Sequence, residues 1–405
     1  MTTPARSLFP ALSQADWWGP FMARREASAS SADLPVALAA AGYPDPASAM
    51  AHTILSNRSV LSTYATGRVP DGLRTLLRAE LWRLGELLRR VNQPVDGVAS
   101  TKHPIVLTGL AEPCLSAGAA ERVAKLASAL STADADGVSS VFLELLRTVG
   151  NGPAALYPVL TWRGGRLEPV RYPDTPAWEE LVDLDDPLER LAQNTEALLL
   201  GRQANDVLAY GARGSGKSTA VRGLAQRYAS GGLRLVEVPV GALEELPLLL
   251  EELRPQPLKF VLFVDDLSFG GGDQEYRPLK SLLEGGVRRR PDNTVVYATS
   301  NRRHLVRERL SDRPDPLDDD VHAWDTHQER LALADRFGLV ITFPAADQRQ
   351  YLKMVRSLAS AKGISLAQDL EERALRFAEW NNGYSGRTAK QFVASLQVAP
   401  DPGRG

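Results

Sequence analysis

The stretch that decides the fold is Gly211-Ala-Arg-Gly-Ser-Gly-Lys-Ser218. It fits the pattern G-x-x-x-x-G-K-[ST], in which a glycine-rich turn lets backbone N–H groups close on phosphate oxygens. The apolar residues 207–210 precede it and the amphipathic residues 217–228 follow it. This order predicts a strand, a phosphate loop and a helix whose N-terminus faces the bound anion. The alternative is a chance match in a glycine-rich turn.

Each part of this loop has a predicted role in binding a nucleotide. The Lys217 ammonium group is expected to reach the β- and γ-phosphates, and the Ser218 hydroxyl is expected to bind Mg²⁺. The remaining residues are expected to surround the phosphates with backbone donors; the nucleotide-binding set is Gly211, Ala212, Arg213, Gly214, Ser215, Gly216, Lys217, Ser218 and Thr219.

A second apolar stretch, Phe260–Val264, ends in two carboxylates. Parallel strands present ligands at their carboxyl ends, so we assign Asp265 to the Mg²⁺ shell. Asp266 is expected to polarise the attacking water, a role that glutamate fills more often, and its shorter side chain predicts slow hydrolysis. An Asp-Asp pair that merely forms a turn is the alternative interpretation.

A third apolar stretch, residues 294–299, is followed by polar side chains. An amide or hydroxyl group there can hydrogen-bond the γ-phosphate or the attacking water. Asn301 is the first choice and Ser300 the second, although Ser-Asn is also an ordinary turn pair.

The order of elements predicts an α/β fold with flanking helical regions. Five apolar segments, separated by helical stretches or long connections, indicate a five-stranded parallel sheet. Segments at helical spacing make up most of the sequence before it and all of the sequence after it. We expect a mostly helical N-terminal domain over 1–150, a small hairpin and linker over 151–185, a nucleotide-binding core over 186–344, a helical lid over 345–398 and a tail over 399–405.

Together these motifs resemble those of the AAA+ P-loop ATPases. Residues 211–219 resemble a Walker A loop, 260–266 a Walker B strand and 297–301 a sensor 1 strand. Residues 333–339 resemble the arginine-finger segment of RuvB-type motors, and 383–387 resemble the sensor 2 motif. The stretches VDDLSFGGGDQEYRPLKSLLEGG and YATSNRRHLV are similar to an uncharacterised bacterial family of predicted AAA+ ATP-binding proteins.

The resemblance implies Mg²⁺-dependent ATP hydrolysis, with ATP held between the α/β core and the lid. Arg336 would enter the site of a neighbouring subunit of a homo-oligomer and stabilise charge on the transferred phosphoryl group. Arg387 would contact the γ-phosphate from the lid. The alternatives are a surface salt bridge for Arg336 and a solvated helix position for Arg387. Remodelling of an unknown protein client is the leading functional hypothesis.

The composition of the chain bears on nucleic-acid binding, on disulfide bonds and on membrane insertion. The 405 residues contain 47 Lys and Arg against 49 Asp and Glu, a net charge of −2, which gives no general basic field for nucleic acid. A single cysteine excludes an intrachain disulfide framework. No apolar run is long enough to span a membrane and the start lacks a signal-peptide pattern, so a cytoplasmic protein is expected.

Two other functions stay open. One is an ATP-binding switch or scaffold with little turnover, which the short Asp266 side chain favours. The other is a DNA-acting loader or motor, suggested by the RuvB-like segment and by the basic run 288–290, although the charge balance does not indicate nucleic-acid binding.

Overall fold

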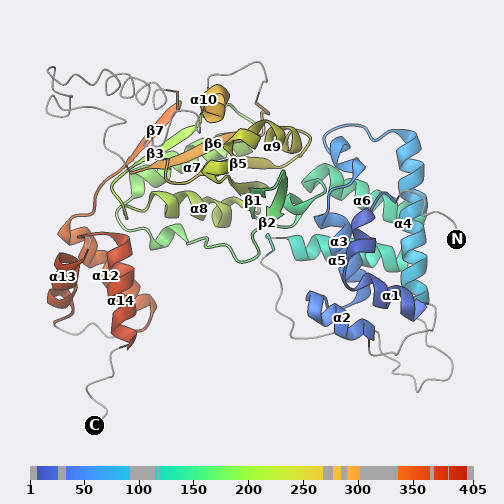
Figure 1. The fold of residues 1–405 in the computed structure, drawn as a ribbon, viewed down its shortest axis with the longest axis horizontal. Coiled ribbons are helices and arrows are strands. Elements are labelled where there is room, and N and C mark those ends of the chain that lie inside the picture. Colours follow the sequence, from blue (N-terminus) through green and yellow to red (C-terminus); the bar gives the residue numbers. More distant parts are fainter. Residues whose placement is uncertain are drawn as a thin grey trace, which may run out of the picture. The chain divides into compact units, whose positions relative to one another are not determined.

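A computed structural model describes residues 7–25, 33–91, 115–116, 118–267, 277–283, 290–301, 336–364, 369–381 and 383–398. The chain divides into two compact units, each built from separate stretches (Figure 1). The first comprises Met1–Pro173, Ala229–Arg234 and Leu248–Phe260, and the second comprises Asp174–Tyr228, Leu235–Pro247 and Val261–Gly405. The domain boundaries drawn from the sequence stay predictions, and the tail over 399–405 lies outside the described residues.

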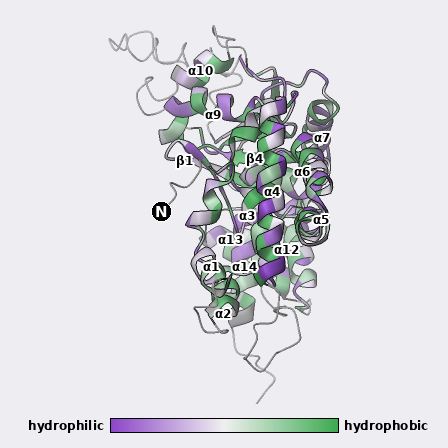
Figure 2. Ribbon diagram, turned by 90° about the vertical axis from the view of Figure 1, so that its right-hand side faces the viewer, coloured by the Kyte–Doolittle hydropathy of each residue, from purple (hydrophilic) through white to green (hydrophobic). Residues whose placement is uncertain are grey.

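The first unit is mainly helical up to residue 149. Helix α4 alternates apolar and polar residues in the manner of a helix with one buried face (Figure 2). Leu77, Leu81 and Leu88 on that face are buried, and α4 packs against α5 and α6. The helices before the sheet are α1 (Trp18–Arg25), α2 (Asp33–Ala41), α3 (Pro46–Ser56), α4 (Asp71–Val91), α5 (Ala119–Thr132) and α6 (Ala135–Val149), with short 3₁₀ turns at Pro10–Gln14, Val60–Tyr64 and Pro153–Ala155.

A seven-stranded sheet follows, with the order β2-β1-β4-β5-β6-β3-β7. Its strands are β1 (Val159–Arg163), β2 (Arg166–Pro169), β3 (Val207–Gly211), β4 (Leu233–Glu237), β5 (Lys259–Val264), β6 (Thr294–Ser300) and β7 (Leu339–Phe343). The five predicted strands correspond to β3–β7, so the fold class is confirmed, but the count of five is wrong. The antiparallel pair β1–β2, expected as a separate hairpin, extends the sheet beside β4. Local sequence patterns do not reveal which distant strand a hairpin will join.

The strand order places β3, the strand that leads into the phosphate loop, between two other strands of the sheet. Strand β3 pairs in parallel with β6 on one side and with β7 on the other. Gly211, the last residue of β3, lies opposite Phe343 at the end of β7. A Cβ atom at Gly211 would lie 2.1 Å from the Phe343 carbonyl oxygen, so only glycine fits where the chain leaves the sheet.

The helices of the second unit are α7 (Asp185–Leu199), α8 (Lys217–Tyr228), α10 (Arg277–Leu283), α12 (Gln348–Ala361), α13 (Leu370–Trp380) and α14 (Gly386–Val398). Short 3₁₀ turns lie at Trp178–Glu180 and Val240–Glu245, and helix α9 (Leu246–Leu253) crosses from the second unit into the first. The last three helices, which fall within the predicted lid, pack around their own apolar cluster, which includes Tyr351, Val355, Ala374 and Phe392. Within the described ranges, no helix has the length and apolar character needed to cross a lipid bilayer.

Helix α8, which begins at the phosphate loop, is covered by the segment that leads into α7. Trp178 is buried there, and its indole N–H donates to the Ala220 carbonyl oxygen at 2.8 Å. Trp178 can approach the backbone of α8 closely because residue 223 of this helix is glycine. A Cβ atom at Gly223 would lie 2.5 Å from Trp178 Cδ1 and 2.8 Å from the Pro176 carbonyl oxygen. Gly223 therefore sets the position of the segment that continues into the walls of the site.

Replacing Gly223 with alanine should destabilise the protein by about 1–3 kcal/mol, because the added methyl group overpacks the contact with Trp178. Urea unfolding followed by circular dichroism measures the change. Gly241→Ala is the matched control, since a Cβ atom there meets nothing within 4 Å. Equal stability of the two variants would contradict the tight contact.

Candidate nucleotide-binding site

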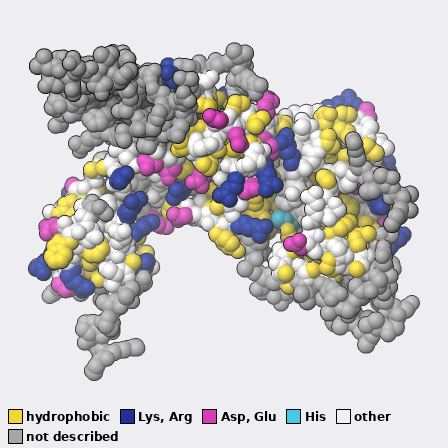
Figure 3. Space-filling view, in the orientation of Figure 1, with side chains coloured by type: hydrophobic (Ala, Val, Ile, Leu, Met, Phe, Trp, Pro, Cys, Tyr) yellow, Lys and Arg dark blue, Asp and Glu magenta, His cyan; other side chains and the backbone are white. Residues whose placement is uncertain are grey.

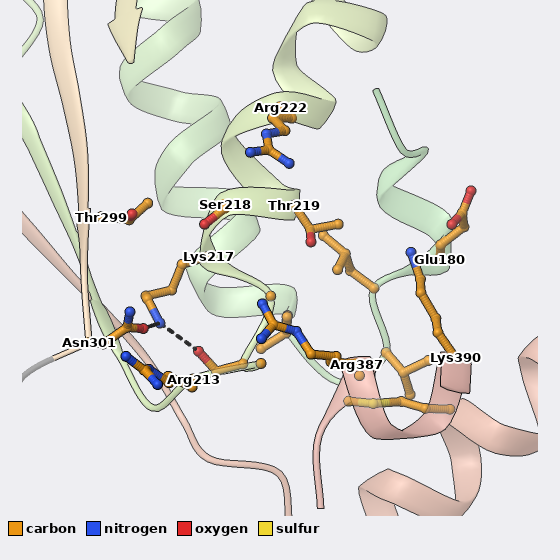
Figure 4. Close-up of a pocket in the computed structure, with 18 of the residues that line it drawn as sticks. Glu180, Arg213, Lys217, Ser218, Thr219, Arg222, Thr299, Asn301, Arg387 and Lys390 are labelled. Carbon is orange, nitrogen blue, oxygen red and sulfur yellow. Dashed lines mark hydrogen bonds between the residues drawn. The ribbon is translucent and has the colours of Figure 1, made fainter. Parts of the chain in front are cut away.

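A cavity of about 670 Å³ opens over the phosphate loop (Figure 4). Four parts of the second unit form its walls: the loop with the start of α8, the carboxyl ends of β5 and β6, the segment before α7, and helices α12 and α14. The lining residues are Glu180, Leu181, Val182, Leu184, Arg213, Gly214, Ser215, Gly216, Lys217, Ser218, Thr219, Arg222, Asp265, Asp266, Thr299, Asn301, Met354, Leu358, Gly386, Arg387, Lys390 and Gln391. Most of the residues predicted from the sequence therefore meet in one cavity.

The conformation of the loop depends on its glycines. Gly214 and Gly216 have φ angles of +74° and +94°, which side chains with a Cβ atom rarely adopt. Gly211 and Ala212 are not among the lining residues, but their carbonyl groups face the Lys217 ammonium group. The loop thus curls around the lysine and opens toward the cavity.

Lys217 is only 5% exposed and its ammonium group is held by oxygen atoms on several sides. It donates to the carbonyl oxygens of Gly211 at 2.9 Å and Ala212 at 2.8 Å, and to Asn301 Oδ1 at 2.9 Å. Burial lowers the pKa of Lys217 to about 8, while the negative charges of Asp266 and Asp265 act in the opposite direction. A phosphate group entering the cavity would supply the negative charge that this buried cation lacks.

The predicted metal ligands lie side by side. Ser218 Oγ donates to Asp265 Oδ1 at 2.6 Å, and Thr299 Oγ1 donates to the same oxygen at 2.6 Å. A hydroxyl and a carboxylate are hard oxygen ligands of the kind that Mg²⁺ takes beside phosphate groups. The donor set therefore fits a Mg²⁺ ion shared with a nucleotide. Among the described residues, no group of three or more His, Cys, Asp or Glu side chains could hold a metal ion by itself.

Asp266 and Asn301 form the other side of the site. Asp266 has a φ angle of +53°, a left-handed conformation in which its backbone N–H donates to Thr299 Oγ1 at 2.8 Å. Its carboxylate accepts a hydrogen bond from Asn301 Nδ2. Asn301 thus bridges Lys217 and Asp266 through the two ends of its amide. Ser300, the second choice, is fully buried and donates to the Leu267 carbonyl oxygen instead.

The lid contributes basic side chains from the first turns of α14. Arg387 is exposed and reaches toward the phosphate loop, with Lys390 on the same helix (Figure 4). The contact between lid and loop is direct: the Gly386 N–H donates to the Gly214 carbonyl oxygen at 3.2 Å. A Cβ atom at Gly214 would lie 2.6 Å from the Ser385 Cβ atom. The glycine at this loop position allows the lid helix to touch the loop backbone.

Arg336 is placed far from the cavity of its own chain. It precedes β7, whose first residue Leu339 pairs with Val207 at the beginning of β3. The phosphate loop starts at Gly211, the other end of β3, four residue steps or roughly 13 Å further along the sheet. Arg336 is half-buried and does not line the cavity.

Several lining residues were not predicted from the sequence. Thr299 lies in the strand end that the sequence singled out, but every residue of β6 is buried, so no pattern of burial distinguishes it from its neighbours. Arg222, Lys390 and the segment Glu180–Leu184 carry no motif of their own. The one available signal was spacing: Arg222 follows Ser218 by four residues, and Lys390 follows Arg387 by three, so each lies about one turn along its helix from a predicted site residue.

These features define the class of the protein. Strand β3, which leads into the phosphate loop, lies in parallel between β6 and β7, and acidic residues follow β5; this is the α/β P-loop fold predicted from the sequence. Residues 155–399 match the family described as "Protein of unknown function (DUF815)", and the chain belongs to that family. No curated protein matches the chain.

Solved structures with a similar fold are only distantly related. The Thermotoga maritima RuvB Holliday junction branch migration motor is 15% identical, with a TM-score of 0.39 over 55% of this chain and 65% of that one, less than two thirds of its length. Aeropyrum pernix ORC1, in complex with DNA, is 14% identical, with a TM-score of 0.40 over 54% of this chain and 60% of that one. AMPPCP-bound DnaA from Aquifex aeolicus is 13% identical, with a TM-score of 0.39 over 57% and 67%.

Replacing Thr299 with valine should destabilise the protein by about 1–3 kcal/mol, because Asp265 loses a donor and the Asp266 N–H loses its acceptor. Thr299→Ser, which keeps the hydroxyl group, should retain most of the stability. Urea unfolding of the two variants and the unaltered protein tests this. If valine is tolerated as well as serine, the hydroxyl group does not support the two acidic residues.

Proposed function

We propose that this protein binds ATP with Mg²⁺ and hydrolyses it, and that hydrolysis drives the remodelling of a macromolecular client. The observation that supports this best is the connected set of side chains in the cavity. Asn301 links Lys217 to Asp266, and Asp265 links Ser218 to Thr299. These contacts would hold the proposed cationic, metal-binding and water-orienting groups in fixed positions relative to one another.

In the proposed mechanism, the loop N–H groups and Lys217 bind the β- and γ-phosphates. Ser218 and Asp265 would hold Mg²⁺, which neutralises phosphate charge when bound. Asp266 would accept a proton from the attacking water, and Asn301 would orient that water or the γ-phosphate. Arg387 would contact the γ-phosphate from the lid, so that the contact between Gly386 and Gly214 transmits the state of the nucleotide to the lid.

Arg336 is proposed to act on a neighbouring subunit. The register of β3 and β7 puts it at the opposite end of the strands from its own phosphate loop, too far for contact with that nucleotide. An arginine that stabilises charge in the transition state must touch the transferred phosphoryl group. A homo-oligomer in which Arg336 completes the next site would satisfy this requirement, whereas the surface salt bridge remains the competing interpretation.

ATP hydrolysis measured over a wide range of protein concentrations tests this proposal. The rate per chain should rise with concentration, and Arg336→Ala should reduce it by about 10³-fold or more while ATP affinity is retained. Asp266→Asn should also bind ATP without hydrolysing it. Arg376→Ala, which removes an exposed arginine of α13 that pairs with Glu372, is the control and should behave like the unaltered protein.

The competing proposal is an ATP-dependent switch with negligible turnover. Two observations favour it: the short Asp266 side chain at the position of the water-activating group, and the direct contact of the lid with the phosphate loop. Tight ATP binding with a flat, negligible hydrolysis rate at every concentration would support the switch over the remodelling ATPase.

The hypothesis of a DNA-acting motor gains less support. Within the basic run, Arg290 is paired with Asp206, while Arg288 and Arg289 lie outside the described residues. Basic and acidic side chains are interspersed among the described residues of the face in Figure 3. A cytoplasmic location and a protein client stay predictions.

The lowered pKa of Lys217 predicts that ATP affinity depends on pH. Below pH 8 the free site already carries the ammonium group, whereas above pH 8 binding must first restore the proton. The dissociation constant for ATP should therefore rise by about tenfold between pH 7.5 and 9. Isothermal titration calorimetry in two buffers of different ionisation enthalpy should show proton uptake at pH 8.5. A constant affinity without proton uptake would mean that Lys217 does not titrate in this range.

A further inference from the structure

We propose that Arg222 is a positioning residue that serves as the counter-ion of the metal-shell carboxylate Asp265 and thereby sets how strongly ATP binding depends on Mg²⁺. This inference rests on the proposed ATP site and deepens it. Arg222 belongs to none of the motifs found in the sequence, yet it lines the cavity beside the predicted metal ligands.

The geometry ties Arg222 to one oxygen of Asp265. Arg222 Nη2 lies 3.1 Å from Asp265 Oδ2, while Oδ1 accepts hydrogen bonds from Ser218 and Thr299. Both oxygens of the carboxylate are thus engaged, one by a cation and the other by two hydroxyl groups. The side chains of Arg222 and Asp265 are 34% and 27% exposed, so the pair is partly shielded from water.

The other charged groups around this pair do not replace Arg222. Asp174 Oδ2 lies 3.9 Å from Arg222 Nη1, but the Asp174 side chain is 84% exposed and is weakly held. Lys217 donates to Gly211, Ala212 and Asn301, on the side of the site where Asn301 contacts Asp266. Among the residues that the structure describes, Arg222 is therefore the cationic side chain that forms an ion pair with Asp265.

This arrangement should affect the binding of metal-free ATP and the binding of Mg-ATP to different extents. Without metal, the polyphosphate must approach the negative charge of Asp265, and Arg222 offsets that repulsion. With metal, Mg²⁺ itself compensates both the phosphates and Asp265, so that the arginine is no longer needed for charge balance. Removing the guanidinium group should weaken the binding of metal-free ATP while leaving the binding of Mg-ATP almost unchanged.

The quantity to measure is the ratio of two dissociation constants for ATP, one with excess EDTA and one with saturating MgCl₂, each obtained by isothermal titration calorimetry on the full chain. For Arg222→Gln, this ratio should rise about tenfold over that of the unaltered protein. Arg222→Lys, which keeps the charge, should restore the ratio to within about twofold. Arg376→Gln on the surface of α13 is the matched control and should leave it unchanged.

The outcomes separate this inference from the proposed function. If the glutamine variant weakens both forms of ATP equally, or leaves both affinities unchanged, Arg222 is not the counter-ion and the inference is overturned, while the ATP site stands. If the unaltered protein binds ATP in neither condition, the proposed nucleotide site fails, and this inference fails with it. A misfolded glutamine variant is identified by circular dichroism, and Arg222→Met, which keeps the length of the side chain without its charge, then takes its place in the same measurement and should raise the ratio in the same way.

Discussion

The buried ammonium group of Lys217 is the interaction on which the site depends. It is surrounded by two backbone carbonyls of its own loop and by the Asn301 amide at the end of β6. A cation buried in this way is stabilised only while those oxygens converge on it, so the loop, β3 and β6 must keep their relative positions. The parallel pairing of β3 with β6 supplies that rigidity. Burial lowers the pKa of Lys217 to about 8, and the negative charges of Asp266 and Asp265 offset only part of this effect.

Close backbone approaches arrange the remaining elements around this group. Gly211 lets β7 pass beside the start of the loop, Gly223 lets Trp178 cover α8, and Gly214 lets the lid helix contact the loop. Each position lacks room for a Cβ atom, so small residues set the distances between the elements that form the cavity. Charged groups are then held in pairs, with Arg222 beside Asp265 and the Asn301 amide between Lys217 and Asp266.

Much of this site could be predicted because its chemistry is local in sequence. The phosphate loop, with its strand before and helix after, is one continuous stretch, and residues 213–219 line the cavity as expected. Asp265, Asp266 and Asn301 could be chosen because parallel strands bring their carboxyl ends together. Thr299 and Arg222 could not be chosen in the same way, since their roles arise from contacts with residues more than 30 positions away.

The sequence alone therefore determined the class of the fold, the phosphate loop and the identity of the acidic and amide groups beside it, because each depends on short-range pattern and on strand polarity. The tertiary structure decided how many strands the sheet contains, since pairing of β1 with β4 joins segments far apart in the chain. It also decided that Arg336 lies at the opposite end of the strands from its own loop, and that Arg222 faces Asp265. Such distances between non-adjacent residues are set by packing, which no local pattern encodes.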